Sequence, residues 1–291
     1  MVIEPDCGWQ GLGISELWRS RELIYFLAWR DVKLRYRQTL LGAAWAMLQP
    51  TLMMLVFTLV IGRLPFGHTS DVAYPLFAFT GLMAWSFFAT AVSSAAQSVV
   101  NAERLVTKIY FPRLAIPVAA VAAGAVDLAA ASLVWVALMS YYHQRPGWTI
   151  VFAPLAVVLL ALAALGSGIL LAALNVRYRD VRYALPFFMQ LWLFATPSIY
   201  LDRSVDEDAT SAVAAQDPQP AVASGAEKEG GRRNWLALNP LDGLILFFRA
   251  TLLGRPAPWR RLIYSTIAVL ALLLAGGLYF RRVESSFADV I

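Results

Sequence analysis

The sequence predicts an all-α integral membrane protein with six transmembrane helices. Hydrophobic residues occupy 59% of its 291 positions and charged residues only 15%, whereas a soluble domain carries roughly 25% charged residues. Several nearly uncharged runs reach the about 20 residues that a transmembrane helix needs. Basic residues gather in alternate loops between these runs, which is typical of helical membrane proteins. We therefore expect a single membrane domain over residues 1–291.

The N-terminal part is expected to lie on the membrane surface. Residues 15–37 place Trp18, Tyr25 and Trp29 on one helical face, with most basic residues elsewhere. The apolar part is too short to span a bilayer, so the segment predicts an interfacial amphipathic helix. An ordinary basic segment beside the first span is the alternative.

Six apolar runs are expected to cross the membrane. Gln49-Pro50 predicts a kink in the first run, and Gly166-Ser167-Gly168 predicts close packing of small residues in the fourth. The runs cover residues 41–61, 74–100, 114–141, 148–174, 184–201 and 262–280.

Loop charges predict the orientation. The short loops on one side hold many basic residues, whereas the two short loops on the other hold only Arg63 and Arg145. The positive-inside rule therefore places both termini in the cytoplasm. The net charge of +5 reflects this orientation, and we expect no nucleic-acid partner.

The long outer segment has two parts. Residues 203–234 are rich in Ala, Gly, Pro and charge, which predicts a flexible outer insertion. Residues 235–254 are apolar but are interrupted by Asn239-Pro240 and Arg249. They predict a re-entrant segment that dips into the outer leaflet, shielded by protein, with a surface helix as the alternative.

Catalytic motifs are absent from the sequence. It contains no GxxxxGK[ST] P-loop and no HExxH motif, so we expect no catalytic residue, cofactor or metal in this chain. Asp127 is charged and lies near the middle of a predicted span, which makes it a functional candidate. Because no Lys, Arg or His is expected at its depth, we interpret it as a protonated or hydrogen-bonded carboxyl between helices. A proton relay, the alternative, usually needs several such groups.

Residues 101–112 predict a short cytoplasmic helix. Apolar residues recur at positions i, i+3, i+4 and i+7 and form one face; they are Ala102, Leu105, Val106 and Ile109. Pro112 ends the element. The polar residues that a cytoplasmic partner could contact are Glu103, Arg104, Thr107 and Lys108.

Four ordered blocks of the chain resemble one family of transporters. The blocks are RDVKLRYRQTLLGAAWAMLQP, KIYFPRLAIP, NVRYRDVRYALPFFMQLWLFATPSIY and NPLDGLILFFR. With these blocks the chain resembles, over about residues 15–290, the membrane subunit of type-two ABC exporters for polysaccharides such as O-antigen, capsule and teichoic acid.

The resemblance implies a homodimer of six-span subunits in the bacterial cytoplasmic membrane, served by two separate cytoplasmic ATPase subunits that bind ATP and Mg²⁺. It also implies that 101–112 is the coupling region and that 235–254 forms re-entrant helices at the outer mouth.

Two residue sets fit such an exporter. Sugar rings stack on aromatic side chains, although aromatic residues that face lipid or pack between helices are the alternative. The candidates for a glycan channel are Trp45, Phe57, Phe187, Phe188, Trp192, Phe194 and Tyr200. A cytoplasmic basic edge could attract the phosphates of a lipid-linked glycan, or could simply control topology; it consists of Arg177, Arg179 and Arg182.

Two other functions remain open from the sequence. An exporter of a small lipid or drug would share the same architecture. A membrane-embedded glycan polymerase would need a catalytic cluster, and residues 177–183 are dense in polar groups but lack a convincing base.

Overall fold

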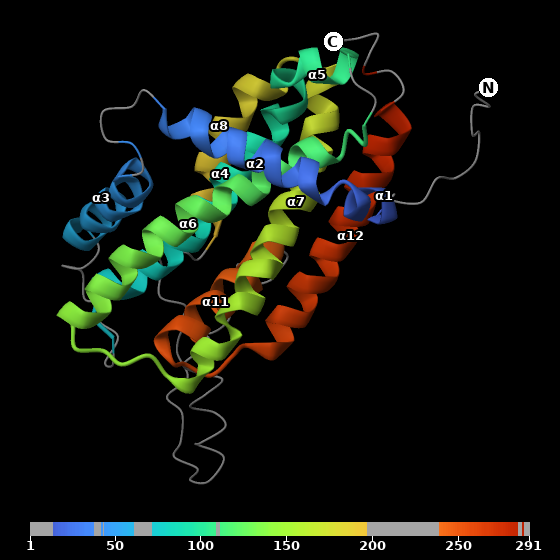
Figure 1. Ribbon diagram of the computed structural model, residues 1–291. Helices are drawn as coiled ribbons and strands as arrows, with labels where there is room; N and C mark the ends of the chain where they lie inside the picture. Colours follow the sequence, from blue (N-terminus) through green and yellow to red (C-terminus); the bar gives the residue numbers. More distant parts are fainter. Residues whose placement is uncertain are drawn as a thin grey trace.

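The computed structural model describes residues 14–37, 42, 44–60, 72–108, 111–196, 239–284 and 287, and the ordered elements among them are all helices (Figure 1). The prediction of an all-α protein is confirmed for this part of the chain. The elements are α1 (Ile14–Arg19), α2 (Arg21–Tyr36), α3 (Ala44–Val60), α4 (Tyr74–Asn101), α5 (Glu103–Lys108), α6 (Ala115–Tyr141), the 3₁₀ turn η1 (Trp148–Phe152), α7 (Ala153–Arg177), α8 (Val181–Ala195), α11 (Pro240–Leu253) and α12 (Trp259–Glu284).

Four helices in the described part are long and apolar enough to cross a membrane. They are α4, α6, η1 continued by α7, and α12. Helix α3 has 17 residues and α8 has 15; at 1.5 Å per residue both are shorter than the about 30 Å of a hydrocarbon core. The expected spans 41–61 and 184–201 run into residues outside the described part, so these two spans stay predictions.

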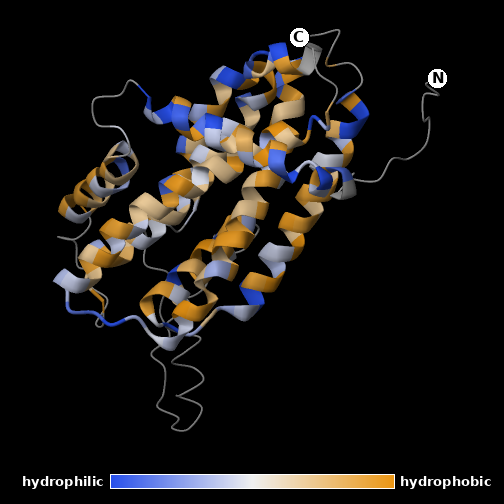
Figure 2. Cartoon of the chain, in the orientation of Figure 1, coloured by the Kyte–Doolittle hydropathy of each residue, from blue (hydrophilic) through white to orange (hydrophobic). Residues whose placement is uncertain are grey.

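Helix α4 is the centre of the bundle. It is buried along most of its length and packs against α3, α6, α7, α8 and α11. Helix α7 packs against both α4 and α12, so α6, α4, α7 and α12 follow one another across the bundle (Figure 1). Figure 2 shows hydrophobic residues along these helices and hydrophilic residues mainly at the two ends of the bundle. This distribution is the one that a bilayer requires of a membrane-spanning bundle.

Small residues allow the central helices to approach closely, as the sequence predicted. A Cβ atom added to Gly168 of α7 would lie 2.6 Å from the Cβ of Ala95 in α4, and one added to Gly166 would lie 2.9 Å from the backbone N of Leu273 in α12. Gly276 of α12 is equally close to α7, because its Cβ would lie 2.7 Å from the carbonyl O of Gly166. These contacts replace the hydrophobic driving force that lipid cannot supply.

The predicted surface helix forms two helices rather than one. It breaks at Ser20, between α1 and α2, and α2 crosses α6 on one side of the bundle (Figure 1). The aromatic face points away from the bundle, since Trp18, Tyr25 and Trp29 are exposed, while Leu27 is buried. The arrangement is that of a helix with one face on the protein and its aromatic face available to the membrane interface.

Helix α11 lies inside the bundle. Asn239 caps its first turn by accepting a hydrogen bond from the backbone N of Leu241, and Gly254 ends it with a φ of +73°. Residues 241–252 are buried against α4, α7, α12 and η1. The alternative of a surface helix is therefore wrong for Pro240–Leu253. Residues 235–238 lie outside the described part, and the re-entrant path stays a prediction. The insertion at 203–234 lies outside the described residues.

Candidate functional site

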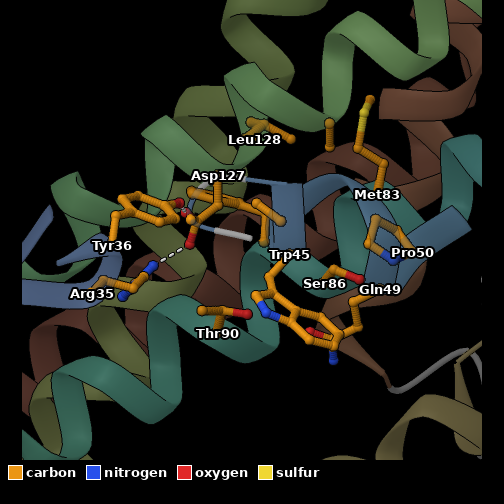
Figure 3. Close-up of a pocket in the computed structure, with 14 residues that line it drawn as sticks. Arg35, Tyr36, Trp45, Gln49, Pro50, Met83, Ser86, Thr90, Asp127 and Leu128 are labelled. Carbon is orange, nitrogen blue, oxygen red and sulfur yellow. Dashed lines mark hydrogen bonds and ion pairs between the residues drawn. The ribbon is translucent and has the colours of Figure 1, made fainter. Parts of the chain in front are cut away.

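A cluster of polar side chains joins the surface helix to the bundle. Arg35, near the end of α2, forms an ion pair with Asp127 in the middle of α6 (Figure 3). Arg35 also donates a hydrogen bond of 3.0 Å from Nη2 to the hydroxyl of Ser94 in α4. The expectation that no basic side chain lies at the depth of Asp127 is therefore wrong. That expectation treated Arg35 as a residue of the membrane surface. In the structure α2 packs against α6, so the last turn of α2 reaches the Asp127 carboxylate.

Tyr36 completes the cluster. Its hydroxyl donates a hydrogen bond to the other carboxylate oxygen of Asp127. Burial is the main cause that raises the pKa of Tyr36 to about 12, and the hydrogen bond and charge of Asp127 add to it. The phenol thus stays neutral and remains a donor at any physiological pH. The prediction that Asp127 is hydrogen-bonded between helices is confirmed.

A cavity opens beside this cluster. It has a volume of about 170 Å³ and lies between α3, α4 and α6, with the end of α2 as one wall (Figure 3). Gly42, in the connection between α2 and α3, also lines the cavity, and its φ of +49° is accessible mainly to glycine. The polar residues that line it are Arg35, Tyr36, Gln49, Ser86, Thr90 and Asp127.

The predicted coupling region forms a short exposed helix. Helix α5 covers Glu103–Lys108, and a turn at Ala102 separates it from α4, so it begins two residues later than the expected 101–112 region. Residues 109 and 110 lie outside the described part. Ala102 is buried and Leu105 packs on the same apolar cluster, whereas Glu103 and Arg104 are exposed. The side chains of Thr107 and Lys108 lie outside the described set. One face of α5 is thus anchored and the other is accessible.

The chain after α5 is tied to the C-terminal helix. The Arg113 guanidinium donates a hydrogen bond to the carbonyl oxygen of Glu284 at the end of α12. Arg281, one turn earlier, forms a 3.1 Å ion pair with Glu16 of α1. These contacts connect the loop after α5, the end of α12 and the N-terminal helix in one polar network.

The basic edge lies beside the coupling region. Arg177, Arg179 and Arg182 are all exposed, in or next to the connection between α7 and α8. Arg182 donates a 3.0 Å hydrogen bond to the side chain of Asn101, the last residue of α4. The structure therefore places this edge next to α5, which the spacing in the sequence alone did not indicate.

Trp192 is packed into the bundle. Its ring contacts Trp85 and Phe88 of α4 edge-on, with centroid distances of 6.4 and 5.6 Å. Its indole N–H donates a 3.2 Å hydrogen bond to Asn239, whose amide also donates a 2.9 Å hydrogen bond to Thr196. Trp192 therefore joins α8, α4 and the start of α11.

The other candidates for the glycan channel divide by exposure. Phe187, Phe188 and Phe194 present 52–64% of their surface on α8, and Trp45 presents 52% on α3. Phe57 packs partly buried against the main core. Tyr200 lies outside the described residues.

Two buried charges in α11 were not singled out by sequence reasoning as site residues. Asp242 forms a 3.5 Å ion pair with Arg261 of α12. The guanidinium of Arg249, a side chain only 3% exposed, lies 3.8 Å from the ring centroid of Phe77 in α4, a cation–π contact. The signal in the sequence was the presence of two charges within an otherwise apolar run.

Comparisons with known proteins agree along nearly the whole chain. Residues 22–208 match the family described as ABC-2 type transporter. The chain is 30% identical over 279 residues to an O-antigen export system permease protein RfbA from Myxococcus xanthus, covering 96% of this chain and 98% of that protein. It is also 21% identical to two proteins of the same description from Klebsiella pneumoniae, each covering 93% of this chain and 95% of the relative.

Proposed function

This chain belongs to the ABC-2 type transporter family, and we propose that it is the permease subunit of an ATP-driven exporter of a polysaccharide or lipid-linked glycan. The observation that carries the proposal is the likeness over 96% of the chain to an O-antigen export permease. The chain is a multi-pass membrane protein and a transport subunit. The geometry supports this function because α5 offers an exposed face at one end of an apolar helical bundle.

The proposed location is the bacterial cytoplasmic membrane, with six spans and both termini inside. Helices α3 and α8 would supply the first and fifth spans, completed by residues next to them in the sequence. Figure 1 supports this topology, because α5, the start of α8 and the end of α12 lie at one end of the bundle, and the connection from α6 to η1 lies at the other.

The proposed energy source is a separate ABC ATPase, in two copies, that binds ATP and Mg²⁺, so this chain needs no cofactor of its own. Glu103, Arg104, Thr107 and Lys108 would contact it. Arg113 follows α5 and is bonded to Glu284, so a displacement of α5 by the ATPase would reach α12. The exposed Arg177, Arg179 and Arg182 would attract the phosphates of a lipid carrier.

The proposed path for the glycan lies between two copies of this chain. Helices α3 and α8 have few neighbours within one chain and expose large apolar side chains, which lipid or a second copy can cover. Phe187, Phe188 and Phe194 are exposed on α8 and would contact a sugar ring, whereas Trp192 is held by α4 and Asn239.

Export of a small lipid or drug by the same architecture is the second candidate function, and the exposed apolar faces are compatible with it. A polymerase has less support, because residues 177–183 show no arrangement of acid and base around a reacting group. The similarity to O-antigen export permeases favours the glycan over both.

Reconstitution tests the proposal. The chain is purified together with candidate ABC ATPase subunits from its host and reconstituted in lipid, and hydrolysis is measured with lipid-linked glycans, small lipids and drugs in parallel. We expect stimulation by a glycan. Stimulation by a drug alone, or glycan polymerisation without the ATPase, contradicts the proposal.

A further inference from the structure

The cavity beside Asp127 has unused hydrogen-bonding groups. The side chains of Gln49, Ser86 and Thr90 line it, and none of the three bonds to another residue in the part of the chain that the structure describes. Serine and threonine in helices commonly bond to the carbonyl of the preceding turn, as Thr80 and Ser167 do here. Ser86 and Thr90 do not, so their hydroxyls remain available to a bound molecule.

The cavity also offers an aromatic face. Trp45 lies beside Gln49 and Ser86 in the close-up view (Figure 3). About half of its surface is exposed, and within the described residues neither its ring nor its indole N–H has a partner. Met83, Phe87 and Leu128 complete an apolar lining. A flat aromatic ring flanked by an amide and two hydroxyls fits a molecule with an apolar face and a hydroxylated edge.

Charge restricts the ligand further. Arg35 and Asp127 are the charged residues that line the cavity, and they neutralise each other. A phosphate near Arg35 would also face the Asp127 carboxylate, and like charges at close range are costly. The lining therefore favours a neutral ligand over an anion.

Size restricts it to one ring. The volume of about 170 Å³ exceeds several-fold the roughly 30 Å³ of one water molecule. It is smaller than the about 300–1,000 Å³ of a pocket for a drug-sized ligand. We propose that this cavity binds a single neutral hexose residue, with Trp45 against the ring face and Gln49, Ser86 and Thr90 bonded to its hydroxyls. The proposal deepens the proposed function, because the hexose can belong to the exported glycan or to a membrane glycolipid.

Binding is tested on the full chain in a detergent without a sugar head group, since a maltoside would occupy the site. Saturation-transfer NMR is recorded with methyl glucoside, methyl galactoside, methyl mannoside and, as the anionic probe, glycerol 3-phosphate. We expect at least one hexoside to bind and glycerol 3-phosphate not to. The pair Gln49→Leu with Thr90→Val, which removes two bonds with little change of shape, should weaken binding by about tenfold or more.

Thr58→Val is the matched control, because Thr58 lies on α3 outside the cavity and its hydroxyl is buried without a partner in the described structure. It should leave binding unchanged. Ser86→Ala serves as the milder variant if the double variant does not fold. Hexoside binding is also compared in nanodiscs with and without monoglucosyl diacylglycerol. If this lipid competes with the hexoside, the site binds a glycolipid; if it does not compete, the site binds the exported glycan.

The proposal is overturned if no hexoside binds to the wild type, if glycerol 3-phosphate binds better, or if the folded variants bind like the wild type. Its failure is distinct from failure of the proposed function. If the wild-type chain binds a hexoside but exports no glycan, the proposed function is wrong and the hexose site stands. If it exports a glycan but binds no hexoside, the proposed function stands and the hexose site is wrong.

Discussion

Arg35 and Asp127, 92 positions apart in the sequence, form an ion pair that joins the end of α2 to the middle of α6. Their side chains are 27% and 16% exposed. Ion pairs that are largely withdrawn from water stabilise little in net terms, but removal of one partner leaves an unpaired charge. The pair therefore fixes where the surface helix crosses the bundle.

Asp127→Asn should destabilise the protein by about 1–3 kcal/mol, because Arg35 loses its charged partner. The thermal unfolding of the purified chain measures this loss. Asp31→Asn is the control, since it breaks only the partly exposed pair of neighbouring residues Arg30 and Asp31, which are 2.9 Å apart. Its effect should stay below about 1 kcal/mol. Removal of both charges by Arg35→Met with Asp127→Leu should recover part of the stability. An Asp127→Asn variant as stable as the wild type contradicts this account.

Charge reversal on α5 should weaken coupling rather than folding. Arg104→Glu places negative charge on the accessible face of α5, and Lys108→Glu adds a second charge at a position that the sequence predicts to be polar. Like charges at an interface oppose association. We expect reduced pull-down of the ATPase and reduced glycan-stimulated hydrolysis, with normal membrane insertion. Arg21→Glu with Arg37→Glu, both exposed in or next to α2, changes the net charge equally and should have no such effect. Normal ATPase binding and export by the α5 variant would show that 101–112 is only a connecting loop.

Gly168→Ala should separate α4 from α7. Its new Cβ would meet the Cβ of Ala95 at 2.6 Å, and overpacking costs about 1–3 kcal/mol. This cost should outweigh the about 1 kcal/mol gained by replacing a helical glycine. Gly124→Ala is the control, because its Cβ would be 3.5 Å from Phe87, an ordinary contact. The two unfolding midpoints should shift in opposite directions, and equal shifts contradict the packing argument.

The aromatic residues of α8 should separate into two classes. Trp192→Ala removes the contacts with Trp85 and Phe88 and the bond to Asn239, and should destabilise the half-buried site by about 2–4 kcal/mol. Phe187→Ala with Phe188→Ala removes exposed rings and should change stability by about 0.5 kcal/mol or less, while reducing export. Unfolding and glycan export are measured side by side. A stable Trp192→Ala protein, or unchanged export by the phenylalanine variant, reverses the assignment.

Topology can be checked by cysteine labelling. In a Cys7→Ser background, a membrane-impermeant reagent added to intact cells should reach a cysteine at Ser211 and not one at Ser286. This follows from the loop charges, which place the C-terminus inside. The opposite labelling pattern would show that the orientation is inverted.

The bounds of the long apolar helices could be predicted from the sequence, because they depend only on where the apolar runs begin and end. The expected spans 74–100 and 114–141 lie within a residue of α4 and α6 at each end. The partner of Asp127 was not readable, because hydropathy assigns a depth to each residue separately and ignores helices that pack across one another. One signal existed, because a carboxylate in an apolar run needs a partner. The sequence offers several basic segments, however, and Arg113 lies much closer to Asp127 along the chain than Arg35 does.

The cavity illustrates a second limit of sequence reasoning. Trp45 was selected for its ring, but Gln49, Ser86 and Thr90 were not, since isolated hydroxyls and amides are common in apolar helices. Only the packing of α3 against α4 shows that they surround one space. Arg249 was similarly visible as a charge, whereas its position over Phe77 depends on the burial of α11.

The hydrogen bonds of the Asn239 amide bear on how much the length of residues 197–238 can vary. It accepts a hydrogen bond from Trp192 and donates one to Thr196, so Thr196 and Asn239, the two described residues that flank 197–238, are held beside each other. The entropy of closing a flexible loop grows only slowly, by about 0.6 kcal/mol for each doubling of length. Insertions, deletions or whole exchanged segments between these two anchors therefore cost little in stability. The length and composition of residues 197–238 can therefore vary without a large loss of stability in the helical bundle that holds Thr196 and Asn239.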